Sequence, residues 1–359
     1  MRNILTVLMF MVLPAAAWSQ RVGWDVDAYG FFDNSEGDDT YRNTVTFSGL
    51  RLRPTATLGT NDGRHRLTAG WDALLEPGTQ DGFTDGTPVA YYTYEERTKG
   101  SRHAYLFAFG AFPRTMMTRM PDYLIADSFC YFRPNVTGMF FRYNRRKKLN
   151  VEAFIDWTAK RTETQREQFM AGVNARWQPS WFQAGVEGYY YHYALETHGI
   201  SLGHHIHDNA VMHAYAGVAK KKVWFLDSLD FKAGVLLNAD RDRGEQMDWY
   251  SPAGFIADLH LRWRQLSLHE TFYAGGSQQH YRQNGWGEYY WGDTYVQAKR
   301  WSRTDVDWTF VKTPFASLTA GLTFNFTPAG FCWHQMVTTR VHLGSHNMKK
   351  NKHKAADPN

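Results

Sequence analysis

Apolar and polar residues alternate along most of the chain. In the segment 252–263, Phe255 and Leu259 share one face of a predicted strand. Asp258 and Arg262 share the opposite face, because successive side chains of a strand point to opposite sides. Each segment of this kind, about ten residues long and bounded by turn signals, predicts one strand. Sixteen such segments lie near 22–33, 44–58, 64–76, 87–98, 102–113, 136–144, 148–159, 167–177, 181–194, 209–220, 227–239, 252–263, 265–275, 303–311, 315–326 and 331–343.

The connections between these segments alternate in length. Short ones lie at 60–63, 99–101, 145–147, 178–180, 220–227, 264 and 313–314. Long ones lie at 34–43, 77–86, 114–135, 160–166, 195–208, 240–251 and 276–302, and only the last connection, 327–330, breaks the rule. A soluble β-sandwich has no reason to sort its connections in this way. The pattern predicts an all-β, antiparallel transmembrane β-barrel of about 16 strands (14–18), with short periplasmic turns and long extracellular loops.

The beginning of the chain predicts export. Arg2 precedes the apolar stretch 4–13 and Pro14, and Ala17-Trp18-Ser19 offers small residues for cleavage, which is the pattern of a secretory signal peptide. A first transmembrane helix is the alternative, but the stretch is too short to cross about 30 Å of hydrocarbon. We therefore expect a signal peptide over 1–19, a barrel over 20–345 and a disordered basic tail over 346–359, in a protein of the Gram-negative outer membrane.

Composition agrees with a barrel and limits the partners. Aromatic residues make up 16% of the chain, yet mean hydropathy is −0.52, as expected where apolar and polar residues alternate and cancel. The formal charge is +5, and the segment 349–354 supplies most of it, so no nucleic-acid partner is inferred. Cys130 and Cys332 could form one disulfide or stay two separate thiols, and both readings remain open.

The predicted inner wall carries charges of both signs. Sixteen strands enclose a lumen wide enough for water, unlike a small barrel that side chains fill. The residues predicted to line this pore are Arg51, Arg53, Arg66, Asp72, Glu152, Asp156, Arg176, Glu187, Lys232, Asp258, Arg262 and Arg340. A mixed wall favours polar or zwitterionic solutes, since fixed charges of one sign set ion selectivity. Alternatively, these charges pair with one another and stiffen the wall.

Two long loops carry candidate functional residues. The third, 114–135, holds charges suited to a constriction, although an ordinary external loop is equally open; these are Arg114, Arg119, Asp122, Asp127 and Arg133. The seventh, 276–302, is rich in aromatic residues suited to contacts with a sugar or aromatic ligand, namely Trp286, Tyr289, Tyr290 and Trp291. Self-packing of that loop over the barrel mouth is the alternative.

Catalytic and metal-binding patterns are incomplete. His204, His205 and His207 have a spacing that could bind Zn or Cu, but no full ligand set is visible. Ser267 with His269 is the nearest approach to a hydrolase site, and it lacks a complete set of nucleophile, base and orienting group. We therefore predict no enzyme activity, no catalytic residues, no metal and no cofactor.

Three short segments carry a family resemblance: FAFGAFPR at 107–114, YFRPNVTG at 131–138 and EYYWGD at 288–293. They resemble porin-like outer-membrane proteins of Bacteroidota, and the resemblance extends over most of the mature chain. It implies location and architecture and leaves activity open. Many such barrels end on an aromatic residue, whereas here the last strand closes near 341–343 and a polar tail follows.

These patterns together predict a porin-like channel for passive passage of small polar solutes, saccharides among them. A barrel plugged by its loops, serving in surface binding or assembly, is the alternative, and an outer-membrane hydrolase is the less favoured one. Expected partners are outer-membrane lipids, the small solute and the outer-membrane assembly machinery, with homo-oligomers open.

Overall fold

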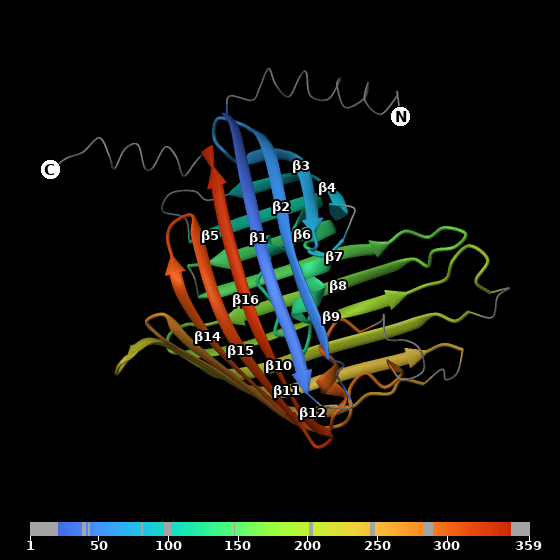
Figure 1. Cartoon of the computed structure of the whole chain (residues 1–359). Helices are drawn as coiled ribbons and strands as arrows, with labels where there is room; N and C mark the ends of the chain where they lie inside the picture. The colour runs from blue at the N-terminus through green and yellow to red at the C-terminus, as the bar shows by residue number, and fades with distance from the viewer. Residues whose placement is uncertain are drawn as a thin grey trace.

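The computed structural model describes residues 21–37, 41, 44–79, 82–96, 102–146, 148–200, 204–244, 248–282 and 290–345. Over these ranges the chain forms one closed barrel of sixteen antiparallel strands (Figure 1). Each strand pairs with the next along the chain, and β1 closes the ring against β16. The predicted signal peptide and basic tail lie outside the described residues.

The strand bounds agree with the predicted segments to within a few residues. They are β1 Arg21–Gly37, β2 Val45–Gly59, β3 His65–Leu75, β4 Phe83–Glu96, β5 His103–Pro113, β6 Asn135–Arg145, β7 Leu149–Ala159, β8 Gln168–Trp177, β9 Phe182–Tyr193, β10 His207–Val223, β11 Leu226–Asp242, β12 Ala253–Trp263, β13 Leu266–Gly275, β14 Arg300–Lys312, β15 Ala316–Thr327 and β16 Gly330–Gly344. Among the described residues, three short helices lie in the long loops: η1 Arg114–Met116, α2 Asp127–Phe132 and η4 Thr294–Gln297. No helix in the described ranges is long and apolar enough to cross a membrane.

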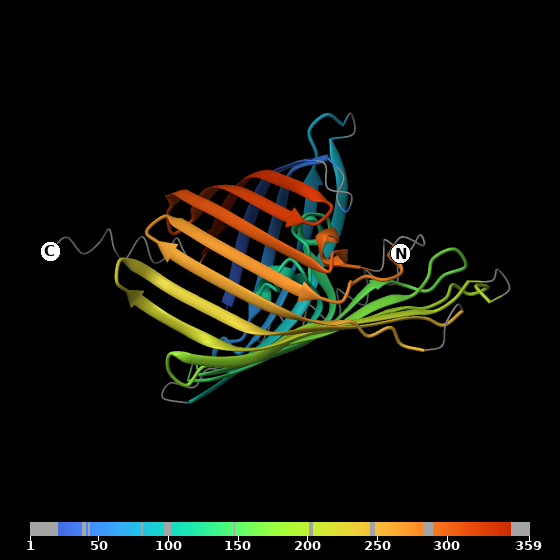
Figure 2. The same ribbon diagram turned by 90° about the horizontal axis from the view of Figure 1, so that it is seen from below.

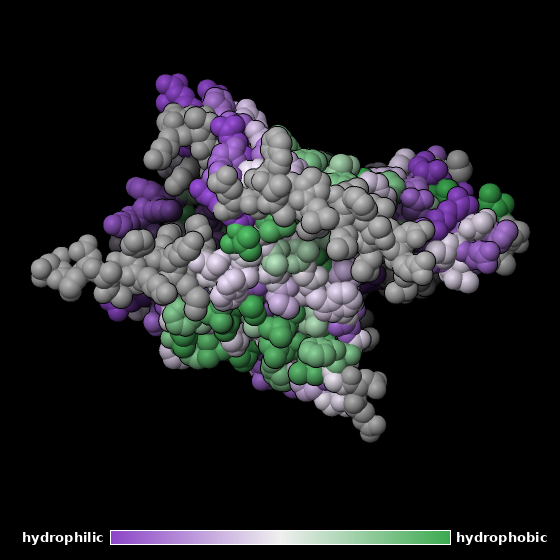
Figure 3. All heavy atoms as spheres, turned by 90° about the horizontal axis from the view of Figure 1, so that it is seen from above, coloured by the Kyte–Doolittle hydropathy of each residue, from purple (hydrophilic) through white to green (hydrophobic). Residues whose placement is uncertain are grey.

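The outward face of the barrel is covered by large apolar side chains, which form green patches on the outer surface in Figure 3. Among them are Leu50, Leu52, Trp71, Phe109, Trp157, Phe255, Phe272, Val306, Leu322 and Val337. Transfer of one such side chain from water to apolar surroundings is favourable by roughly 1.5–3 kcal/mol of free energy. An apolar belt of this extent is therefore the surface that lipid covers.

The two ends of the barrel differ as the connection lengths predict. The first residues of β1 and the last of β16 lie at one end, where Arg21 pairs with Gly59 and Asp25 with Gly344. The short connections lie at this periplasmic end and the long loops at the other. At the long-loop end, the green and yellow strands extend past their neighbours (Figure 2). The predicted fold, its strand number and its location in the outer membrane are confirmed.

One connection was predicted wrongly. The expected link at 220–227 is only the two-residue turn Trp224-Phe225, because β10 and β11 continue to pair as far as Val223 and Leu226. Lys222 and Trp224 take left-handed backbone angles, φ 54° and 53°, which close the turn tightly. The polar run of lysines suggested a loop, but strand pairing overrides that local preference.

Candidate functional site

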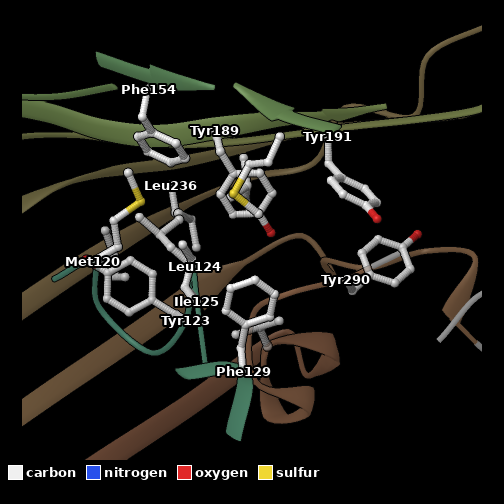
Figure 4. Close-up of a cluster of buried hydrophobic side chains, with 14 of the residues drawn as sticks. Met120, Tyr123, Leu124, Ile125, Phe129, Phe154, Tyr189, Tyr191, Leu236 and Tyr290 are labelled. Atoms are coloured by element: carbon white, nitrogen blue, oxygen red, sulfur yellow. The ribbon is translucent and has the colours of Figure 1, made fainter. Parts of the chain in front are cut away.

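The third long loop folds into the barrel. Pro113 pairs with Asn135 at the ends of β5 and β6, and the chain between them turns inward. Tyr123 and Leu124 of this inner loop, residues 114–134, are buried against wall residues such as Tyr189 (Figure 4). The loop therefore fills part of the lumen and is not an ordinary external loop. Its charges were noticed in the sequence, whereas its anchoring residues Met120, Tyr123, Leu124 and Ile125 were not.

Polar contacts fix the inner loop to several sides of the wall. Thr118 donates hydrogen bonds to Glu152 of β7 from its backbone nitrogen at 2.8 Å and from its hydroxyl at 2.7 Å. The hydroxyl of Tyr123 lies 2.8 Å from Nδ1 of His213 on β10. On the opposite side, Nε of Arg51 donates to the carbonyl of Tyr131 at 2.6 Å. The loop thus spans the cross-section from β2 to β10.

Part of the seventh long loop packs on the inner loop. The ring of Trp291 lies 3.9 Å from that of Phe129 and 5.3 Å from that of Tyr191, centroid to centroid. Tyr290 is buried, and its hydroxyl donates to Asp240 of β11. Tyr290 and Trp291 therefore take part in packing, while Trp286 and Tyr289 lie outside the described residues. Contact of these four aromatic residues with a ligand stays a prediction.

Arg303 of β14 joins both loops to the wall. Its Nη2 lies 2.6 Å from Asp122 and 3.7 Å from Asp127, both on the inner loop, and Nη1 lies 3.7 Å from Asp293. Asp305 on the same strand lies 2.9 Å away, and the Arg303 side chain is only 6% exposed. Sequence reasoning missed Arg303, because its partners are distant along the chain; its inward position on β14 was the available signal.

Arg119 is a charged group of the inner loop that is exposed inside the barrel. It pairs with Asp122 at 2.8 Å and with Asp127, yet its side chain is 59% exposed inside the closed barrel. Burial raises the pKa of Asp127 to about 6, against the lowering effect of Arg119. Arg119 and its two aspartates, with Arg303 behind them, form what we term the constriction cluster.

The other two predicted constriction residues hold the ends of the inner loop. Arg114 pairs with Asp156 of β7 at 2.6 Å, and Arg133 donates to the carbonyl of Thr158 at 2.9 Å. Arg133 is exposed, and its guanidinium lies 5.5 Å from the ring of Trp291. The loop is therefore tied to the outer part of β7.

All twelve residues predicted to line the pore lie on the inward face of their strands, and most of them are in ion pairs. Arg51 binds Asp72 at 2.8 Å, Arg53 lies 3.6 Å from the same aspartate, and Arg66 pairs with Glu95 at 3.2 Å. The remaining pairs are Glu152 with Arg142, Asp156 with Arg114, Arg176 with Asp230, Glu187 with Lys232 and Asp258 with His269. Arg262 and Arg340 are exposed near the periplasmic end, where Arg340 lies over Tyr29 at 4.9 Å. The wall is thus stiffened by ion pairs over much of its area.

The remaining candidates are dispersed. His204, His205 and His207 face three different carboxylates, and the described part of the chain holds no group of His, Cys, Asp and Glu able to bind a metal. Cys130 and Cys332 do not form a disulfide with each other. Ser267 lies 3.5 Å from Asp307, whereas His269 bonds Asp258, so the two do not form a nucleophile and base.

Solved structures share this fold. The loop-deleted OmpT of Vibrio cholerae superimposes with a TM-score of 0.51 at 9% identity, covering 89% of this chain and 99% of that one. OccK2 and OprD of Pseudomonas aeruginosa give TM-scores of 0.48 and 0.47 at 10% and 9% identity, each covering 91% of this chain and 99% and 94% of theirs. No curated protein matches the sequence.

The closed barrel and its apolar belt define an outer-membrane β-barrel, and its fold is similar to that of porins. The chain belongs to the lipid A 3'-O-deacylase-type family, whose sequence profile matches residues 14–329. Our prediction that the protein is not an enzyme is therefore wrong, because the family is described by an enzymatic activity. An origin in Bacteroidota stays a prediction.

Proposed function

We propose that the barrel is a narrow channel for small polar solutes. The observation that carries this proposal is Arg119, whose side chain is 59% exposed although it sits on a loop inside the closed barrel. That exposure supports an inner loop that narrows the lumen beside the constriction cluster without sealing it. Since Arg119 stands beside Asp122 and Asp127, the opening offers both signs of charge, which suits polar or zwitterionic solutes better than ions of one sign.

The channel is tested by single-channel recording in planar bilayers. We expect open steps whose selectivity shifts toward cations as pH rises through about 6, because Asp127 gains its negative charge there. The pKa of that carboxylate is also affected by the charges around it, which belong to Arg119, Arg303, Asp122 and Asp305. Asp127→Asn should abolish the shift and keep the open steps. A folded barrel that never conducts would exclude the channel.

A second function, hydrolysis of acyl esters in outer-leaflet lipid, is favoured by the family and by one site on the outer wall. His192 of β9 and Asp208 of β10 are paired in register at the long-loop end. Nδ1 of His192 lies 2.8 Å from Oδ1 of Asp208, and the hydroxyl of Tyr190 donates to the same oxygen at 2.6 Å. Their neighbours of the same parity, such as Met212, are exposed on the lipid face.

This arrangement can activate water. Asp208 is fully buried, and Arg241 and Arg243 each donate to its Oδ2 at 2.8 Å, so it stays an anion able to orient the imidazole. With Nδ1 engaged, Nε2 of His192 is the nitrogen that can take a proton from water as it attacks an ester carbonyl, and it can return that proton to the departing sugar oxygen when the acyl–oxygen bond breaks. The guanidinium groups nearby provide positive charge for the developing oxyanion.

We expect His192→Ala to lower release of acyl chains from lipid A by about 100-fold or more, the usual contribution of a general base. Mass spectrometry of lipid A incubated with the purified barrel measures this. His269→Ala is the matched control, since His269 makes a similar pair with Asp258 but inside the lumen. Equal activity in the two variants would rule out the His192 site.

A further inference from the structure

One carboxylate lies on the outward face of the barrel at the middle of a strand. Glu270 is the fifth residue of the ten-residue strand β13, and it pairs with Leu259 and Thr304. Two residues further along the same face, Phe272 is 45% exposed, whereas Thr271 on the other face is buried. Side chains of a strand alternate between its two faces, so Glu270 points toward the lipid.

The ends of β13 fix the depth of Glu270 in the membrane. Leu266 pairs with Trp308 at the periplasmic end, and Ala274 pairs with Arg300 near the long-loop end. A tilted strand of about 9–11 residues crosses the hydrocarbon layer. A strand of ten residues is therefore just long enough, and its middle lies deep in that layer. An ionisable group at this depth is costly, and such groups usually pair with another protein group.

Elsewhere on the described strands, the outward charges lie near the strand ends. Glu36 is the second-last residue of β1, Glu96 is the last of β4 and Arg145 is the last of β6. Near the membrane surface, water and lipid headgroups can solvate such side chains. The position of Glu270 is therefore not explained in the same way.

Two hydroxyl groups of the neighbouring strand lie on the same face as this carboxylate. The Thr304 hydroxyl donates to Oε2 of Glu270. Ser302 is two residues further along the outward face of β14 and pairs with Phe272. Oε1 of Glu270 can still accept a hydrogen bond and the Ser302 hydroxyl can donate one, but lipid tails offer a partner to neither. We term Glu270, Ser302 and Thr304 the β13–β14 patch.

We propose that the β13–β14 patch is the contact surface between two copies of this chain. Rotation about an axis along the membrane normal keeps every residue at its own depth, so a second copy can place the same patch opposite the first. Ser302 of each copy then donates to Oε1 of Glu270 in the other. A two-fold interface makes each of its contacts twice, so these two hydrogen bonds are reciprocal.

A lysine or arginine of a different protein would be the other way to cover Glu270. The outward lysines and arginines of the described strands lie near the strand ends, so a copy of this chain does not bring a cation to that depth. The Ser302 hydroxyl is a donor that a second copy does bring there. The contact goes beyond both proposed functions, since neither the lumen nor His192 takes part in it.

Sedimentation equilibrium of the purified full chain in detergent micelles tests the proposal. We expect a dimer whose dissociation constant rises about tenfold or more in Glu270→Leu, the size of effect expected when hydrogen bonds between membrane segments are lost. The variant should fold, because leucine is a normal lipid-facing residue. Ser302→Ala should weaken the dimer in the same direction. Thr137→Leu is the matched control, since Thr137 is exposed on the outward face of β6, on the far side of the ring.

Oxidative cross-linking in isolated outer membranes shows where the two copies meet. Phe272→Cys should form a disulfide between two copies, whereas Phe109→Cys, on the outward face of β5, should not. A monomeric protein that also fails to cross-link would overturn the proposal, and so would a dimer equally stable in Glu270→Leu and Ser302→Ala. A disulfide between Phe272→Cys and a different protein would instead assign the patch to another partner.

Discussion

Replacing residues 114–134 by Asn-Gly should raise single-channel conductance severalfold and leave the barrel folded. The inner loop occupies the lumen, so its removal widens the path for ions. Pro113 already pairs with Asn135, and a two-residue Asn-Gly turn matches the twist of such a hairpin. Conductance in planar bilayers gives the result, and altered mobility of the unheated protein in electrophoresis reports folding.

The control for this deletion is an external loop. Removing residues 77–79, exposed between β3 and β4, shortens the chain without touching the inner loop. Its conductance should equal that of the unaltered protein. If the two deletions have the same conductance, the inner loop does not limit the passage of ions.

Arg303→Met should destabilise the folded barrel by about 3–5 kcal/mol, the usual cost of removing one partner of a buried ion pair. Asp122, Asp127, Asp293 and Asp305 would then face one another with their common counterion lost. Both loops should loosen together, because Arg303 is a wall residue that pairs with carboxylates of both. Unfolding in denaturant measures the free energy, and conductance should rise in the same variant.

Two further variants show how much of the stability lost in Arg303→Met comes from the buried ion pairs. Arg340→Met removes an exposed guanidinium over Tyr29, a contact worth about 0.5–1 kcal/mol, so it shows the cost of an arginine without a buried pair. Adding Asp122→Asn to Arg303→Met should recover part of the stability, since one of the four facing carboxylates then loses its charge. If Arg303→Met lowers the free energy of unfolding no more than Arg340→Met does, the role given to Arg303 is contradicted.

Part of the candidate site could be predicted from the sequence, and part could not. The charges of 114–135 were identified, and so were the inward charges of the strands, because both follow from position within a repeating pattern. The pair His192 and Asp208 was not identified, because it exists only once β9 and β10 pair in one register. The enzyme family was missed for a related reason: residues close together in the chain do not supply a nucleophile beside its base.

The sequence by itself determined the sixteen strands, their alternating faces and the end at which the long loops lie. These are local properties, since a strand's two faces repeat every second residue and a connection's length is read directly. Only the tertiary structure decided what fills the lumen. The packing of Leu124 on Tyr189 and the meeting of Arg303 with Asp122 join segments far apart in the chain. Such contacts depend on how the closed barrel brings distant segments together, and no local pattern contains that geometry.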